Sequence, residues 1–168
     1  MLLGDDGVGP YVVQWLSASY SFPEGVEVED LGTPALDFID RIVGLDALIV
    51  IDAVDNDQPA GSVTLYRKED VLRHAPTVRM DTHSPALTES LMAAEVFFGQ
   101  SPKEVLLIGI STESCQADCT PSAPVRAAVP SAVKAVLQEL TRLGIPLSAR
   151  QNTSPPKAWQ PALAAVAE

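Results

Sequence analysis

Two carboxylates and one imidazole are the side chains in this sequence with the clearest chemical potential. Asp6 lies in the turn Gly4–Pro10 (GDDGVGP), Asp52 directly follows a short apolar run, and His83 precedes the start of a later helix. Two carboxylates and an imidazole, with no fourth protein ligand, suit a divalent first-row metal ion that keeps an open coordination position. The three residues are therefore a candidate metal site if their connections open on the same edge of the fold.

Each of these residues also has a purely structural explanation. Aspartate is a preferred helix N-cap, so Asp5 or Asp6 is well placed to cap the helix that follows the turn. An aspartate at a strand end is often a turn residue, and a loop histidine such as His83 is often a surface or capping group. Taken singly, the residues leave both interpretations open.

Other catalytic arrangements have less support. His83 as a general base needs a nucleophile, and the adjacent Ser84 has poor geometry for a Ser–His pair. Cys115 and Cys119 are spaced C-x3-C without a second pair, and we interpret them as two loop thiols. The sequence has no phosphate-binding loop, and acids occupy the positions where a dinucleotide-binding turn approaches a pyrophosphate.

Alternating strands and helices must position these side chains. Ala47–Ile51 and Glu104–Ile110 are apolar runs typical of strands buried on both faces of a parallel sheet, and ligands bind at the carboxyl ends of such strands. Further strands are predicted at Val26–Leu31 and Ser62–Tyr66. Helices are predicted after Pro10, after Thr33, after Ser84 and over residues 125–143. The helix after Ser84 should end at Gly99 and bury one apolar face, made of Leu87, Leu91, Met92, Val96 and Phe97. This alternation predicts a layered α/β fold.

Composition limits the classes of protein. The 168 residues suit one domain over residues 1–144, followed by a Pro- and Ala-rich tail over 145–168 that we expect to be flexible. No apolar run approaches the roughly 20 residues of a membrane span, and no secretory leader is recognisable. Two cysteines are too few for a disulfide framework, so we expect a cytoplasmic protein without a membrane partner.

The net charge of −11 is concentrated at the start of the chain. Residues 1–60 hold twelve acids against one base, Arg41, whereas the remainder has ten of each. Because nucleic-acid binding depends on Lys and Arg that neutralise phosphates, nucleic acid is excluded as a partner class. An acidic half is compatible with a cationic peptide, with a metal ion or with a solvated surface.

Several motifs together carry a family resemblance. They are Gly4–Pro10, then Asp30–Pro34 (DLGTP), then Ile49–Val54 (IVIDAV), then His83 ahead of Leu87, and finally Gly109–Ile110. In this order the sequence resembles the nickel–iron hydrogenase maturation endopeptidases, from Leu3 to about Gly144.

The resemblance implies a cytoplasmic protease with a twisted, mostly parallel sheet between helices, hence three layers. Its partner would be the large-subunit precursor of the hydrogenase, from which it removes a C-terminal extension after nickel insertion. Asp6, Asp52 and His83 match the family's metal-contacting, catalytic positions, and the nickel would be supplied by the precursor. Asp5 would then be the acid that orients the turn. Nickel acting as a Lewis acid and a carboxylate that activates water both remain open as mechanisms.

One feature departs from the family. Its members carry an apolar strand and a Gly-x-Gly-Asn turn before the Asp-Asp motif, where only Met1-Leu2-Leu3 stands here. The resemblance thus implies a missing central strand, through either a late start site or a truncated chain. Two other functions stay open: a non-catalytic metal-sensing or chaperone module for hydrogenase assembly, and a hydrolase of unrelated small substrates on the same scaffold.

Overall fold

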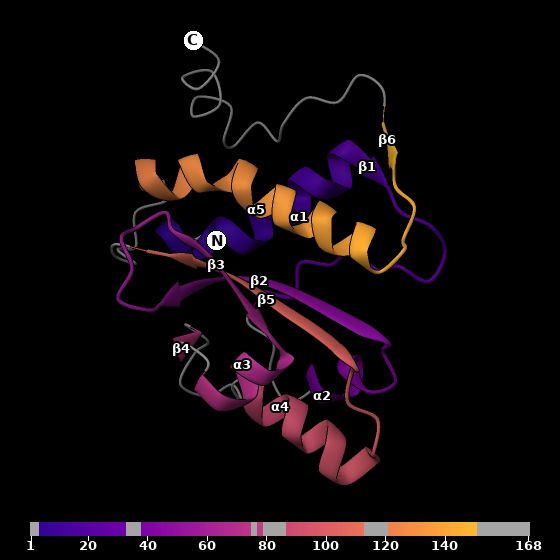
Figure 1. Cartoon of the computed structure of the whole chain (residues 1–168). Coiled ribbons are helices and arrows are strands. Elements are labelled where there is room, and N and C mark those ends of the chain that lie inside the picture. The colour runs from indigo at the N-terminus through magenta and orange to yellow at the C-terminus, as the bar shows by residue number, and fades with distance from the viewer. Residues whose placement is uncertain (1–3, 33–37, 75–76, 79–86, 113–120, 151–168) are drawn as a thin grey trace.

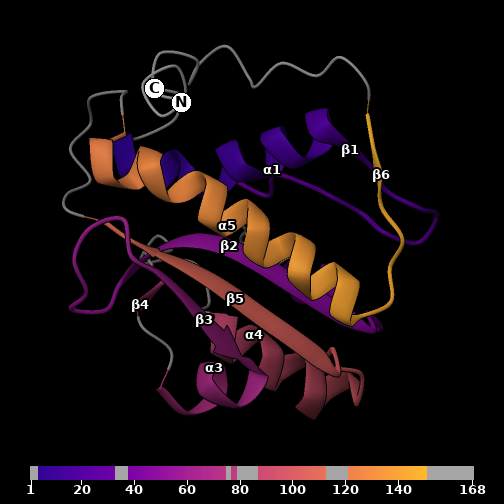
Figure 2. The same cartoon turned by 45° about the horizontal axis from the view of Figure 1, so that its top comes forward.

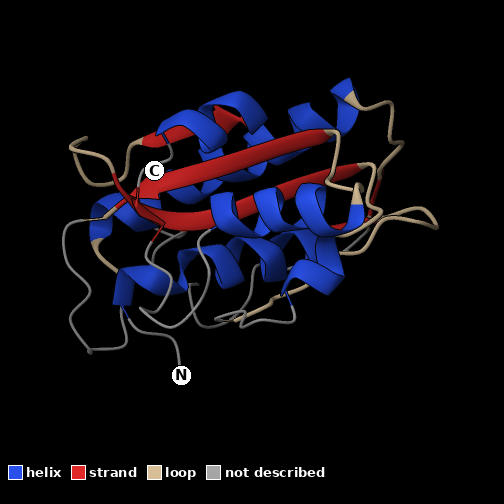
Figure 3. Ribbon diagram, turned by 90° about the horizontal axis from the view of Figure 1, so that it is seen from below, coloured by secondary structure: helices blue, strands red, loops and turns tan. Residues whose placement is uncertain are grey.

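Two parallel strands form the centre of the fold. A computed structural model describes residues 4–32, 38–74, 77–78, 87–112 and 121–150. Strand β2 (Ala47–Asp55) pairs in parallel with β5 (Glu104–Ser111), in register from Ala47 opposite Glu104 to Val54 opposite Ser111. The apolar runs predicted these strands, and the two run side by side in Figure 3.

The outer strands of this sheet are antiparallel to the central pair. Strand β3 (Val63–Arg67) pairs with β5, and the short β4 (Thr77–Val78) pairs with Val54 and Asp55 of β2. The strand order is therefore β3-β5-β2-β4. The predicted α/β fold is confirmed, and its sheet is mixed, with parallel pairing between the two central strands.

Helices cover both faces of the sheet, which gives three layers (Figures 1 and 2). The short 3-10 turn η1 (Gly4–Gly7), α1 (Val8–Ser19) and α5 (Ala123–Arg142) lie on one face. The other face carries α2 (Phe38–Ile42), α3 (Lys68–His74), α4 (Leu87–Ala93) and its π-helical continuation η2 (Ala94–Phe98). The sequence analysis did not predict α3, because the sequence of this helix is mostly polar.

Each face of the sheet has its own apolar core. Alternation along β2 sends Ile49 and Ile51 toward the α1–α5 core, whereas Leu48 and Val50 pack against the α2–α4 core. Burying a strand on both faces requires a continuous apolar run, which is the pattern that the sequence shows for β2 and β5.

Two predictions about the scaffold need correction. Val26–Leu31 forms no strand, although its apolar and acidic residues alternate. In the helix after Ser84, Leu87 and Leu91 are buried as predicted. The remaining three residues of the predicted buried face are instead exposed, namely Met92, Val96 and Phe97.

The beginning of the predicted tail is attached to the domain. Strand β6 (Ser148–Ala149) pairs antiparallel with β1 (Tyr20–Ser21), and Ile145 and Leu147 pack against the α1–α5 core. Residues 145–150 therefore extend the folded domain, whereas 151–168 lie outside the described residues. The predicted absence of a first central strand concerns the chain before Gly4, and residues 1–3 also lie outside the described residues.

Candidate active site

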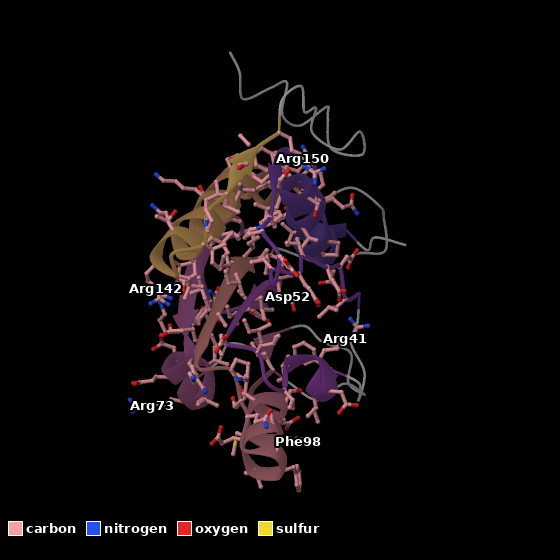
Figure 4. All side chains as sticks on the ribbon, turned by 90° about the vertical axis from the view of Figure 1, so that its right-hand side faces the viewer. Arg41, Asp52, Arg73, Phe98, Arg142 and Arg150 are labelled. Atoms are coloured by element: carbon pink, nitrogen blue, oxygen red, sulfur yellow. The ribbon has the colours of Figure 1, made fainter. Side chains whose placement is uncertain are left out.

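Strand β2 carries the first candidate residue, Asp52, close to its carboxyl end. Asp52 is partly buried and lies opposite Gly109 of β5 in the parallel register. The backbone N–H of Ala53 donates a hydrogen bond of 2.8 Å to its Oδ1 atom, which fixes the orientation of the carboxylate. Figure 4 shows Asp52 at mid-height in the molecule, beside the sheet.

The start of α1 brings the second candidate, Asp6, to the same end of β2. Gly9 lies so close to the strand that a Cβ atom built on it would be 2.4 Å from the carbonyl oxygen of Ile51. No other residue type fits this approach without a shift of the backbone. The glycine thus lets η1, which contains Asp6, pack against β2 next to Asp52.

Asp5, the neighbour of Asp6, has the structural role that the sequence analysis assigned to it. Its side chain is only 2% exposed and accepts two hydrogen bonds from Ser122, one from the backbone N–H at 2.6 Å and one from Oγ at 3.1 Å. Ser122 is the residue before α5, so this carboxylate joins the Asp6 turn to the start of the longest helix.

The two candidate carboxylates influence each other electrostatically. Burial is the main cause that raises the pKa of Asp52 to about 6, and the charge of Asp6 raises it further, while the hydrogen bond from Ala53 acts in the opposite direction. A carboxyl group with this pKa exchanges its proton near neutral pH, as general acids and bases must. Two acids that repel each other also favour a bound cation, which would relieve the repulsion.

The third candidate, His83, lies outside the described residues, as do Cys115 and Cys119. Within the described part of the chain, no group of three or more His, Cys, Asp or Glu side chains could hold a metal ion. The structure therefore brings Asp6 and Asp52 together, and the place of His83 beside them stays a prediction.

A polar cluster at the same edge was not found from the sequence. Ser111 Oγ donates a hydrogen bond of 2.6 Å to Asn56 Oδ1, and Asn56 Nδ2 donates one of 2.8 Å to the hydroxyl of Tyr66. The next residue, Thr112, has a buried hydroxyl without a hydrogen-bond partner in the described structure. These residues come from three separate segments, so only the position of Asn56 and Ser111 at strand ends could have pointed to them.

Comparison with known proteins assigns the chain to a family. A sequence model described as hydrogenase maturation protease matches residues 10–139. The chain belongs to this family. Hydrogenase maturation proteases are peptidases, so the resemblance noted in the sequence and the expected enzyme class are both confirmed.

Individual relatives agree with this assignment. The hydrogenase expression/formation protein HoxM of Azotobacter vinelandii is 33% identical over 154 residues, which are 90% of this chain and 73% of the relative. The hydrogenase 2 maturation protease of Escherichia coli is 27% identical over 145 residues, covering 86% of this chain and 88% of the relative.

A solved structure shows the same fold. The hydrogenase maturating endopeptidase HybD from Escherichia coli superposes with a TM-score of 0.80 at 28% identity, over 90% of this chain and 93% of that protein. None of the helices in the described residues of this protease has the length and hydropathy to cross a membrane.

Proposed function

We propose that this protease removes the C-terminal extension of a nickel–iron hydrogenase large-subunit precursor in the cytoplasm, after nickel has been inserted. The precursor's nickel is the recognition element, bound by Asp6, Asp52 and His83. The observation that carries the proposal is the coupled pair of acids, Asp6 and Asp52, at the carboxyl end of a central strand.

The chemistry of the two acids suggests how nickel-loaded precursor would be distinguished from empty precursor. Without a cation, burial and the charge of Asp6 both oppose the ionisation of Asp52 and raise its pKa to about 6. A divalent ion held by the precursor would compensate both negative charges. A precursor without nickel offers no such compensation, so it binds more weakly in this position.

Asp52 is also the group of the described chain best placed to move a proton. The backbone N–H of Ala53 holds one of its carboxylate oxygens, Oδ1, in place. Attack of water on the scissile carbonyl requires a base, and a carboxylate with a pKa near 6 is ionised often enough at neutral pH to serve. The nickel ion, as part of the substrate, can polarise the same carbonyl as a Lewis acid.

The test compares precursor processing by intact mass. Wild-type protease should shorten nickel-loaded precursor and leave nickel-free precursor unchanged. Asp6→Ala, Asp52→Ala and His83→Ala should each slow cleavage by about 100-fold or more, since each removes one proposed ligand. Asp40→Ala is the matched control, because Asp40 is an exposed acid on α2.

Three results would count against this function. Near-normal processing by all three variants would exclude the assigned site, and equal cleavage of nickel-free precursor would exclude nickel as the recognition element. An unchanged precursor mass with the wild-type protein would instead indicate a metal-sensing or chaperone module.

A further inference from the structure

The helix formed by α4 and η2 exposes an unusual amount of apolar surface. Four large side chains lie within seven residues of sequence, and their exposed fractions are 54% for Met92, 73% for Val96, 78% for Phe97 and 51% for Phe98. These four residues are called the α4 patch below. Figure 4 shows Phe98 on the outermost helix of the α2–α4 layer.

A change of helix type turns Phe98 outward. Leu87, Leu91 and Ala94 are buried against the sheet at helical spacing, and continued α-helix would bring Phe98 onto the same face. The π-helical turn over Ala94–Phe98 adds one residue to the turn and rotates Phe98 away from the core. Gly99, with a φ of 64°, then ends the helix.

The patch is large enough to mark an interaction site. With about 200 Å² for each large side chain, the exposed fractions amount to about 500 Å² of apolar surface. Contiguous apolar patches of this size on a folded protein are commonly binding surfaces, because exposing them to water is unfavourable. Among the described residues, the four side chains of the α4 patch are not part of the α2–α4 core.

Charge and area argue against a second copy of this chain as the occupant. The helix from Leu87 to Phe98 contains two acids, Glu89 and Glu95, and no base, and the whole chain has a net charge of −11. Two copies that met here would bring like charges together. The patch is also smaller than the roughly 800 Å² that each partner buries in a stable dimer. A different protein, with an apolar pocket rimmed by Lys and Arg, fits better.

The position of the patch indicates a large partner. The helix ends near the amino end of β5, because only five residues separate Phe98 from Glu104, whereas Asp52 lies opposite Gly109. Five residues of strand span about 17 Å, so a peptide of only a few residues in the acidic site does not reach the patch. A folded protein that presents its tail to the acids has the size to contact both.

We propose that the α4 patch is the docking surface for the folded body of the precursor, whose tail is cut at Asp6 and Asp52. This inference rests on the proposed function. Docking away from the cut site supplies binding energy shared by ground state and transition state, so its loss should raise KM and leave kcat unchanged.

The experiment uses the double variant Val96→Ser/Phe97→Ser, which changes the two most exposed side chains of the patch. Its Kd and KM for nickel-loaded precursor should rise by about 10-fold or more with kcat unaltered. Leu65→Ser is the matched control, since Leu65 is 46% exposed on β3 and lies outside the patch. This control should keep its Kd within about 2-fold of the wild-type value.

A charge reversal tests the basic rim of the partner. Glu95→Lys should weaken precursor binding, and this variant should lose part of the salt dependence that the wild-type protein shows. Unchanged binding by both Glu95→Lys and the double variant would overturn the proposal. A wild-type dimer that the double variant abolishes, measured by light scattering, would also overturn it in favour of a second copy.

Binding and cleavage are measured separately, so two failures can be told apart. If wild-type protein binds precursor but leaves its mass unchanged, the proposed function fails while the comparison of Kd values still decides the docking surface. If precursor is cleaved and both variants keep the wild-type KM, the docking surface fails and the proposed function stands.

Discussion

The two central strands, β2 and β5, have similar sequences and different surroundings. In β5 every residue from Val105 to Ser111 is buried, whereas in β2 the residues from Ala47 to Asp52 are only partly buried. Strand β5 lies between β3 and β2 along most of its length. In the described part of the chain, the other edge of β2 is paired only at Val54 and Asp55.

The difference follows from the neighbours that each strand has in the described part of the chain. An apolar run predicts a strand in the middle of the molecule, but its neighbours decide how deeply it is buried. The register shows this at one position, where the partner of Asp52 is Gly109. The same layer of the sheet thus holds a carboxylate with a raised pKa in one strand and a tightly packed glycine in the other.

The largest expected effect on activity comes from changing Asp52, the register partner of Gly109. Asp52→Asn should lower cleavage of nickel-loaded precursor by about 1,000-fold or more, because the variant loses both a ligand charge and a base. Gly109→Ala should mainly lower stability, since its Cβ would lie 2.8 Å from Val54 Cγ2. Rates from precursor mass and melting temperatures from circular dichroism would separate the two effects.

The stability of Asp52→Asn provides the control. Folding raises the pKa of Asp52, so its ionised form destabilises the folded protein as pH rises above the unfolded value. In the absence of nickel, Asp52→Asn should therefore be at least as stable as the wild type at pH 7.5, by up to about 3 kcal/mol, and the gain should shrink at acid pH. A melting temperature well below the wild-type value would contradict the assignment of Asp52 to function rather than packing.

A matched pair of isoleucines tests burial next. Ile51 and Ile108 are register partners on the same face of the sheet, and Ile108 is fully buried whereas Ile51 is partly buried. Ile108→Ala should lower the free energy of unfolding by about 4 kcal/mol and Ile51→Ala by about 2 kcal/mol, because the deeper site loses more contacts. Urea titration gives both values, and equal losses would show that the two strands are equally buried in solution.

The packing of α1 on β2 should respond to Gly9→Ala. The added Cβ would be 2.4 Å from the Ile51 carbonyl oxygen, so the helix has to move away from the strand. We expect a loss of about 2 kcal/mol in stability, together with slower cleavage, because Asp6 moves with the helix. Full activity at reduced stability would show that the position of Asp6 does not depend on this contact.

The smallest expected effect on stability concerns the ion pairs of Glu139 with Arg67 and Arg142. Glu139 of α5 is 4% exposed and accepts hydrogen bonds from Arg142 and Arg67, and these partners lower its pKa to about 2 despite burial. Its stabilising contribution is complete above the unfolded pKa near 4.5 and disappears as pH falls toward 2.

Glu139→Gln should therefore cost roughly 1 to 2 kcal/mol at pH 7, less than the full pKa shift implies because both arginines are partly exposed to solvent. The difference from wild type in urea titrations should vanish only below about pH 2. Glu104→Gln, which removes only an exposed partner of Arg142, serves as the control and should change stability by less than about 0.5 kcal/mol.

Sequence reasoning succeeded where one local pattern is sufficient. Continuous apolar runs predicted β2 and β5, and the rule that ligands bind at the carboxyl ends of parallel strands made Asp52 a candidate. A long helix was likewise predicted over residues 125–143, where α5 spans Ala123–Arg142. Each of these patterns can be interpreted without knowing which distant segment packs against it.

Sequence reasoning failed where pairing with a distant segment or a local distortion of a helix determines the structure. Val26–Leu31 alternates like a strand, but strand structure requires a paired neighbour that periodicity does not report. The predicted buried face of the helix after Ser84 was wrong at Met92 and Val96, which ordinary helical spacing places away from Leu87. The π turn then exposes Phe98 as well, which helical spacing cannot predict. Strand β6 has two residues, too few for any pattern, and pairs with β1 more than a hundred residues earlier.

The parallel pairing of β2 with β5 has a consequence for synthesis on the ribosome. Ala47 and its partner Glu104 are far apart along the chain, with α3 and α4 between the two strands. At about 5 to 20 residues per second, β2 leaves the ribosome several seconds before β5 does. During this interval its apolar residues have no strand of the central pair to bind. A nascent chain stalled between these strands should therefore be captured by a general chaperone, and one stalled well after Ser111 should not.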